Sequence, residues 1–344
     1  MKLGFVVNIM ESDVTGATTY RMVADAINAG HEVWVMSTGN LAYNPDGTTG
    51  AFARTVPPGR YTSERFLEVF KNKKQAINQW ITLDDLDVIM LRNNPSVQHS
   101  WAQSAGVHFG RLAMRNGVIV LNDPNGLSKA ANKLYLQTFP ESVRPRTLVS
   151  RSLSRIEKFL NDEGVIIMKP LQGSGGVGVF IVRDNEEHNL EDIFASVSRD
   201  GYVIAQEYLP AAAEGDTRLF LMNGVPLKHK GKYAAFRRVR TGDDIRSNIH
   251  AGGRLRRAEL TDTMFQLAET VRPRLVEDGM FLVGLDIVGD KLMEINVFSP
   301  GGFGSAQKFE KVNFTHAVLE SLEKKVQYMK FYGRNLSNVN LATL

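Results

Sequence analysis

The chain has 344 residues, 43% of them hydrophobic and 23% charged, which is typical of a globular protein of two or three packed units rather than a disordered one. Its 41 basic and 37 acidic residues leave a net charge of +4, too small an excess to indicate a nucleic-acid-binding surface. The absence of cysteine excludes disulfides, thiolate metal sites and a cysteine nucleophile.

The first third of the sequence alternates between strand and helix patterns. Residues 2–7 form a short apolar run that lacks the length and cleavage pattern of a signal peptide, so it predicts a first strand. A helix near 18–29 and strands at 31–36, 88–91 and 118–121 continue a doubly wound rhythm, which predicts an open α/β sheet. Residues 44–62 are rich in Pro, Gly and Thr and predict hairpin strands or a loop excursion.

A turn-forming cluster at 122–126 marks the first domain boundary. It follows an apolar strand and precedes a predicted helix at 128–139. We therefore expect an N-terminal α/β domain at 1–123 and a second, two-lobed domain at 124–315, divided near 208. A helix at 314–328 and a loose polar tail complete a C-terminal segment at 316–344.

The rhythm changes after the boundary, where short β-rich pieces dominate. Helices are predicted between some of them, at 154–161, 190–198 and 258–277, and this pattern favours an antiparallel α+β unit. The predicted strands are 146–149, 165–169, 177–182, 202–207, 217–222, 225–232, 281–288 and 292–297.

A glycine-rich segment at 173–178 matches G-x-G-x-x-G, the dinucleotide-binding pattern. That fingerprint requires a helix after the glycines, whereas here a β-rich piece follows as well as precedes them. The Gly-Lys-Ser/Thr ending of a P-loop is also missing. A glycine turn between strands is either a ligand-free hairpin or a flap over a nucleoside triphosphate, and Lys169 before it favours the flap.

A pair of carboxylates lies near the C-terminus of the second unit. The segment from Gly284 to Asn296 reads as two strands joined by a Gly-Asp turn, so Asp286, Glu294 and Asn296 can share one face. Flanking apolar residues predict a mostly buried hairpin, in which unpaired carboxylates would be costly. Three hard oxygen ligands without His or Cys suit Mg²⁺ shared with nucleotide phosphates, against the alternative of a solvated strand face.

The order and spacing of these motifs resemble those of the bacterial glutathione synthetases, members of the ATP-grasp superfamily. The resemblance covers most of the chain. It rests on Asn132-Lys-Leu134, Lys169-Pro-Leu with Gly173-Ser-Gly-Gly176, Ala205-Gln-Glu-Tyr-Leu-Pro210, Gly215-Asp-Thr-Arg218, Arg246-Ser-Asn248 with Ala251-Gly-Gly253, and Val283-Gly-Leu-Asp286 through Glu294-Ile-Asn-Val297.

The family implies a role for each matching position. The catalytic residues would be Arg218, Arg246 and Asn248, of which both arginines face the reacting acyl-phosphate. Asp286, Glu294 and Asn296 would bind Mg²⁺, with Mn²⁺ as an alternative ion. The nucleotide residues would be Lys133, Lys169, Gly173, Ser174, Gly175, Gly176, Gln206, Glu207, Tyr208, Leu209 and Asp216. The substrate residues would be Ser299, Gly301, Gly302, Gly252 and Gly253.

The locally basic stretch from Lys228 to Arg257 is either a solvated surface or, as the resemblance implies, a wall around triphosphate and anionic substrate. The expected reaction phosphorylates a substrate carboxylate with ATP and lets an amine displace phosphate. Because acyl-phosphates hydrolyse readily, a lid that excludes water is expected, and we assign it to 235–253.

Two segments depart from the family. Ser299-Pro is followed by Gly-Gly-Phe-Gly instead of a threonine-cysteine pair, and the loop at Asn93-Asn-Pro95 replaces an acidic one. Three readings remain: glutathione synthetase, another peptide or amide ligase with a different amine acceptor, or a non-catalytic ATP-binding relative. A nicotinamide-dependent oxidoreductase is the alternative outside this fold. The resemblance further implies a cytoplasmic homo-oligomer acting on small molecules, without nucleic-acid or membrane partners.

Overall fold

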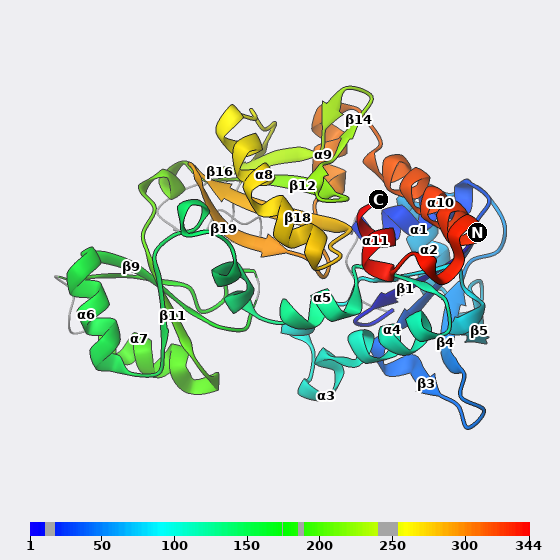
Figure 1. Ribbon diagram of the computed structural model, residues 1–344, viewed down its shortest axis with the longest axis horizontal. Coiled ribbons are helices and arrows are strands. Elements are labelled where there is room, and N and C mark those ends of the chain that lie inside the picture. Colours follow the sequence, from blue (N-terminus) through cyan, green and yellow to red (C-terminus); the bar gives the residue numbers. More distant parts are fainter. Residues whose placement is uncertain (11–17, 174, 185–188, 240–253) are drawn as a thin grey trace.

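The computed structural model describes residues 1–10, 18–173, 175–184, 189–239 and 254–344 (Figure 1). The described residues form a seven-stranded, a four-stranded and a six-stranded sheet, with helices between them, and a small two-stranded ribbon. The mixed α/β and α+β architecture predicted from the sequence is confirmed.

The N-terminal sheet has the order β3-β4-β2-β1-β6-β7, with β5 paired to β4. Its parallel part is β1 (Lys2–Val7), β2 (Glu32–Ser37), β6 (Val88–Leu91) and β7 (Ile119–Leu121). Its antiparallel part is β3 (Leu41–Tyr43), β4 (Thr49–Thr55) and β5 (Ile77–Thr82). The helices of this part are α1 (Thr18–Asn28), α2 (Ser63–Lys71), α3 (Ser100–Gln103) and α4 (Ala105–Arg115). Residues 44–62 thus supply a hairpin strand, one of the two predicted alternatives.

The single helix predicted at 128–139 is wrong. The chain instead forms α5 (Pro124–Lys129) and, after a break, the 3-10 segment η4 (Lys133–Thr138). The break occurs because Asn132 is extended and its side chain accepts a hydrogen bond from the Leu134 amide, so it caps a new turn rather than continuing the old one.

The second sheet belongs to a separate lobe, drawn in green at the left of Figure 1. Its order is β10-β9-β11-β8 and all its pairings are antiparallel. The strands are β8 (Thr147–Ser150), β9 (Val165–Pro170), β10 (Phe180–Arg183) and β11 (Val203–Glu207). Helices α6 (Leu153–Glu163) and α7 (Leu190–Val197) bury apolar side chains such as Ile156, Leu160 and Ile193 against it, which gives the lobe its own core.

The third sheet has the order β17-β16-β12-β18-β19, with β13 paired to β12. Its strands are β12 (Asp216–Met222), β13 (Val225–Pro226), β16 (Ala235–Val239), β17 (Arg254–Arg256), β18 (Leu282–Val288) and β19 (Lys291–Asn296). Strands β14 (Lys228–His229) and β15 (Lys232–Tyr233) form the ribbon. Apolar residues of α8 (Asp262–Glu277), including Leu267, Val271 and Leu275, share a core with this sheet.

Residues 235–239 of the predicted lid do not form a loop. They are β16, which pairs with β12 through Asp216 opposite Arg238 and Leu219 opposite Ala235. Ala235 and Phe236 point to opposite faces of the sheet and both are buried, so apolar contacts on two sides stabilise this stretch as a strand. The rest of the predicted lid, 240–253, lies outside the described residues.

The C-terminal segment packs against the N-terminal domain. After α9 (Phe303–Glu310), helix α10 (Phe314–Tyr332) contacts α1, and Phe314, Val318 and Leu322 share a core with Met22. The loose tail predicted after it is wrong, because α11 (Asn338–Thr343) buries Leu341 and Ala342.

A buried asparagine side chain makes three hydrogen bonds across the boundary between the first domain and the third sheet. The Asn122 Nδ2 donates to the Leu282 and Val297 carbonyls at 3.1 and 2.5 Å, and its Oδ1 accepts from the Leu282 amide at 2.8 Å. Every polar atom of this carboxamide is therefore paired, which fixes β7 against β18. Among the described residues, no helix is both long and apolar enough to cross a membrane.

Candidate active site

The glycine-rich segment is a hairpin turn between two strands. β9 and β10 pair antiparallel, with Met168 opposite Phe180, and the glycines lie between them. Gly173, Gly175 and Gly176 have positive φ angles of 123°, 69° and 75°, which side chains disfavour and which leave their backbone open to a ligand. Because a strand and not a helix follows, the dinucleotide-binding alternative is rejected.

This hairpin covers one side of a cavity of about 360 Å³ between the second and third sheets. The opposite wall comes from β18 and β19, and a third side comes from the segment 130–137. Most of the predicted site residues line it: Lys133, Lys169, Gly173, Gly175, Gly176, Gln206, Glu207, Tyr208, Leu209, Arg218, Asp286, Glu294, Asn296 and Ser299. Residues as distant in the sequence as Lys133 and Ser299 thus meet around one space.

Two lysines lie on the hairpin side of the cavity. The Lys133 Nζ donates to the Pro170 and Gly173 carbonyls at 3.1 and 2.8 Å, which ties it to the glycine turn. The Lys169 Nζ donates to the Gln206 Oε1 at 2.9 Å. Burial lowers the pKa of Lys133, and it lowers the pKa of Lys169 to about 8, with Glu294 partly opposing both shifts. A polyanion entering here would meet poorly solvated ammonium groups, which strengthens its attraction to them.

Apolar side chains form another part of the lining. Ile167, Val179, Ile204, Leu209 and Met293 contribute to it, and their positions suit a flat ring system. Apart from Leu209, the sequence analysis did not identify these residues as part of the site. The alternation of side chains along β9 could have identified Ile167, because it lies two residues before Lys169 and so faces the same side of the strand.

The carboxylate hairpin has the predicted geometry. Asp286 on β18 pairs with Glu294 on β19, and Gly284 pairs with Asn296, with an irregularity after Asp286. Asp286, Glu294 and Asn296 all line the cavity, so one face of the hairpin presents them together. The described residues hold no group of three or more His, Cys, Asp or Glu arranged for a metal ion. This set of two carboxylates and one amide fits Mg²⁺ only if other oxygens, such as phosphates, complete the coordination.

Two arginines contact the central carboxylate. Arg218 forms a bidentate pair with Asp286, and its Nη1 donates to the Gly301 carbonyl at 3.2 Å. Arg238 lies 2.9 Å from Asp286 and also pairs with the buried Asp216. Although burial alone would raise the pKa of Asp286, these arginines hold it at about 2. The carboxylate is therefore ionised at any physiological pH, and an anionic ligand in the cavity would meet two guanidinium groups.

Arg238 lines the cavity but was not among the predicted site residues. The sequence offered ten cations between Lys228 and Arg257, and only the register of β16 on β12 shows that Arg238 lies opposite Asp216. Other cations of this stretch form surface contacts, such as Arg237 with Glu214 and Arg257 with Glu310. Asp216 itself does not line the cavity and reaches it through Arg238.

Of the predicted substrate residues, one lines the cavity and another is hydrogen-bonded within the protein. Ser299 lines the cavity, whereas the Gly302 amide donates to the Thr18 Oγ1 at 3.1 Å and so is occupied within the protein. The turn at 300–302 is further fixed by Arg92, whose Nη2 donates to the Pro300 carbonyl at 3.0 Å. Ser174, Arg246, Asn248, Gly252 and Gly253 lie outside the described residues.

The chain matches known proteins over nearly its whole length. The model of the prokaryotic glutathione synthetase N-terminal domain matches residues 1–128, and that of the ATP-grasp domain of the same family matches 132–311. The chain is 31% identical to the glutathione synthetase of Synechococcus elongatus and 30% identical to that of Escherichia coli K12, over 338 residues in each case. Each alignment covers 95% of this chain and 99% of the relative.

Solved structures share the fold at lower sequence identity. D-cycloserine synthetase DcsG superposes with a TM-score of 0.60 and 14% identity over 93% of this chain and 99% of that one. D-alanyl-alanine synthetase A from Vibrio cholerae superposes with a TM-score of 0.56 and 12% identity over 95% and 98%. These likenesses show a shared fold, while the family models and the relatives show the family, including its ATP-grasp domain: the chain belongs to the prokaryotic glutathione synthetases.

Proposed function

We propose that this ATP-grasp ligase is itself a glutathione synthetase, which joins γ-glutamylcysteine to glycine and converts ATP to ADP and phosphate. The observation that carries the proposal is one cavity in which two half-buried lysines, two arginines and a carboxylate hairpin converge under a glycine turn. A site that concentrates cations around acidic ligands suits phosphoryl transfer to a carboxylate, because that reaction gathers negative charge in one place.

The described residues can be assigned to separate parts of this reaction. The Ile167, Val179 and Ile204 side would receive adenine, next to the hydrogen-bonding backbone of residues 206–209. Lys133 and Lys169 would bind the phosphates under the glycine turn. Arg218 and Arg238 would hold the substrate carboxylate and the transferring phosphoryl group in line, where their fixed positions stabilise the developing charge.

The chemistry then proceeds without a covalent enzyme intermediate. The carboxylate oxygen of γ-glutamylcysteine attacks the γ-phosphorus, and the bond to the β-phosphate oxygen breaks to release ADP. The amine of glycine next attacks the acyl carbon, phosphate leaves, and the amine loses its proton. We also propose Arg246 and Asn248 as partners of the acyl-phosphate, and Ser174, Gly252 and Gly253 as part of the cover, on the family resemblance alone.

Asp286, Glu294 and Asn296 would hold Mg²⁺, or Mn²⁺ in its place, together with the phosphates. When bound, the ion neutralises phosphate charge and orients the γ-phosphoryl group. The structure supports this proposal through the donor set: the Asn296 Nδ2 faces Asp286 at 3.3 Å, which leaves the amide oxygen as a ligand. A cytoplasmic homo-oligomer, and domain limits at 1–123, 124–315 and 316–344, are proposed from the sequence.

Phosphate release from Mg-ATP by the purified protein tests the function. Release that requires both γ-glutamylcysteine and glycine, with glutathione identified by mass, supports the proposal, and Asp286→Ala serves as the inactive control. Release of phosphate with γ-glutamylcysteine and an amine other than glycine would show that the enzyme uses a different acceptor. Absence of any release with both substrates would refute glutathione synthesis.

A further inference from the structure

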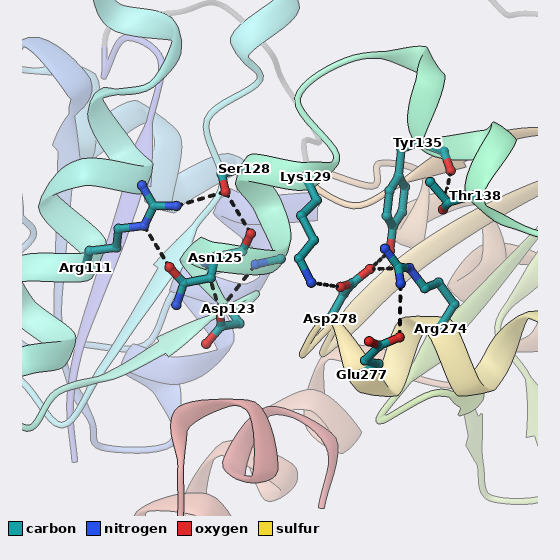
Figure 2. Close-up of polar contacts among 11 residues, drawn as sticks. Arg111, Asp123, Asn125, Ser128, Lys129, Tyr135, Thr138, Arg274, Glu277 and Asp278 are labelled. Atoms are coloured by element: carbon teal, nitrogen blue, oxygen red, sulfur yellow. Dashed lines mark hydrogen bonds and ion pairs between the residues drawn. The ribbon is translucent and has the colours of Figure 1, made fainter.

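Asp278 is a buried carboxylate that the proposed chemistry does not use. It follows α8 and its side chain is fully buried. Three side chains surround it: the Lys129 Nζ and the Tyr135 hydroxyl donate hydrogen bonds at 2.5 and 2.9 Å, and the Arg274 guanidinium forms an ion pair through Nε at 2.9 Å (Figure 2). A buried charge is tolerated only when it is well paired, so the Asp278 carboxylate restricts where these three side chains can lie.

The two hydrogen-bond donors lie at and within the segment 130–137, which forms one wall of the ATP cavity: Lys129 directly precedes it and Tyr135 belongs to it. Lys129 ends α5 and Tyr135 lies in η4, and Ala130, Asn132 and Lys133 between them line the cavity. Tyr135 itself is among the residues that line the cavity, and its hydroxyl donates to Asp278. The Asp278 carboxylate, which directly follows α8, therefore anchors the chain both before and after Lys133.

The backbone of α5 lies directly on the turn that carries Asp278. A Cβ atom at Gly126 would lie 1.8 Å from the Asp278 carbonyl oxygen, so only glycine permits this approach. The Asp123 amide donates to the Gly279 carbonyl at 3.0 Å. The backbone of α5 is thus fixed on the Asp278–Gly279 turn. The hydrogen bonds of Lys129 and Tyr135 to Asp278 then determine the path of the chain that follows α5.

We propose that Asp278 is a positioning residue of the ATP site, which acts through Tyr135 and Lys129 on the segment that carries Lys133. The proposal rests on the assignment of the cavity to ATP. An ammonium group must lie within hydrogen-bonding distance of a phosphate oxygen, and displacements of about 1 Å are enough to lose much of that interaction. Loss of either bond to Asp278 therefore weakens nucleotide binding, although neither side chain presents its polar end to the nucleotide.

The other face of α5 offers a matched control. The Arg111 Nε donates to the Asn125 Oδ1 at 2.9 Å, and its Nη2 donates to the Ser128 Oγ at 2.8 Å (Figure 2). These bonds hold the same short helix against α4, but Arg111, Asn125 and Ser128 do not line the cavity. Arg111→Met thus removes support from α5 without touching the anchor on Asp278.

The test compares Tyr135→Phe, Lys129→Met and Arg111→Met with the unaltered protein. Tyr135→Phe keeps the ring and removes only the hydroxyl, and Arg274 still pairs with Asp278, so we expect the variant to fold. The dissociation constant of Mg-ATP is measured by calorimetry without the acid substrate. KM for ATP, KM for the acid and kcat follow from phosphate release, and urea denaturation gives stability.

We expect Tyr135→Phe and Lys129→Met each to raise the dissociation constant and KM for ATP about fivefold to tenfold. KM for the acid and kcat at saturating ATP should stay within about twofold, Lys129→Arg should restore binding, and Arg111→Met should leave ATP affinity unchanged. Equal ATP affinity in all variants, or a loss in Arg111→Met as large as in Tyr135→Phe, would refute the positioning role. Failure of the unaltered protein to bind Mg-ATP would refute the ATP site itself.

Discussion

Replacing Asp286 with asparagine removes the charge that holds Arg218 and Arg238 together, and it keeps the shape of the side chain. The pKa of Asp286 lies at about 2, compared with an ordinary value of 3.8. This difference corresponds to about 2.5 kcal/mol of stabilisation by its ionised form. The asparagine variant should lose at least that much stability, since two buried guanidinium groups also lose part of their compensation.

The pH dependence gives this prediction a second signature. Because the folded protein has the lower pKa, the stabilisation is fully present above about pH 4 and disappears as the pH falls through about 2. Urea denaturation at pH 5 and pH 7 should therefore show the same difference between Asp286→Asn and the unaltered protein. ATP turnover should fall at least about 100-fold, because a proposed metal ligand is lost.

Asp290 at the tip of the same hairpin is the control for this substitution. Its side chain is 71% exposed and lies 3.9 Å from the Lys291 ammonium, so Asp290→Asn should change stability by less than about 0.5 kcal/mol and leave turnover intact. If Asp286→Asn were as stable as Asp290→Asn, the carboxylate would not hold the arginines as argued. If it were fully active, the carboxylate would not belong to the catalytic centre.

Three other predictions concern the nucleotide, the ion and the backbone. Because Lys169 has a pKa of about 8, kcat/KM for ATP should fall above that pH, whereas the Lys169→Arg variant should show no such fall. A fall in both proteins would mean that a group other than Lys169 titrates. Chelation by EDTA should abolish turnover while circular dichroism stays unchanged, and Mg²⁺ or Mn²⁺ should restore it; turnover that survives chelation would contradict the ion-dependent site. Gly126→Ala should lower the melting temperature by more than about 10 °C, because its Cβ would clash with the Asp278 carbonyl, whereas Gly39→Ala, whose Cβ would make only an ordinary 3.6 Å contact with the Trp101 ring, should cost far less.

Much of the site could be predicted from the sequence because its residues lie on strands with local signals. The β18–β19 hairpin is an example: the Gly289-Asp290 turn fixes the pairing, and pairing fixes which of its side chains face the cavity. The glycine turn between β9 and β10 is another, since strand patterns on both sides exclude a helix. In these cases residues close in sequence determine the geometry.

The missed features depend on contacts between distant residues. Arg238 joins the site because β16 pairs with β12 in one particular register, and nothing within its own stretch distinguishes it from the neighbouring cations. The predicted helix at 128–139 breaks because the Asn132 side chain caps a new turn and Tyr135 bonds to Asp278, which lies 143 residues further along. Only the folded structure brings Asp278 and Tyr135 together.

The packing of α10 against α1 also has a consequence for how the protein is made. The apolar side of α1, including Met22, completes its core with Phe314 and Val318 from the far end of the chain. During synthesis, therefore, α1 emerges from the ribosome well before α10, and this core can close only once α10 has followed. Until then, the part of α1 that packs on α10 stays uncovered, and this apolar surface is where a partly made chain is open to non-native contacts.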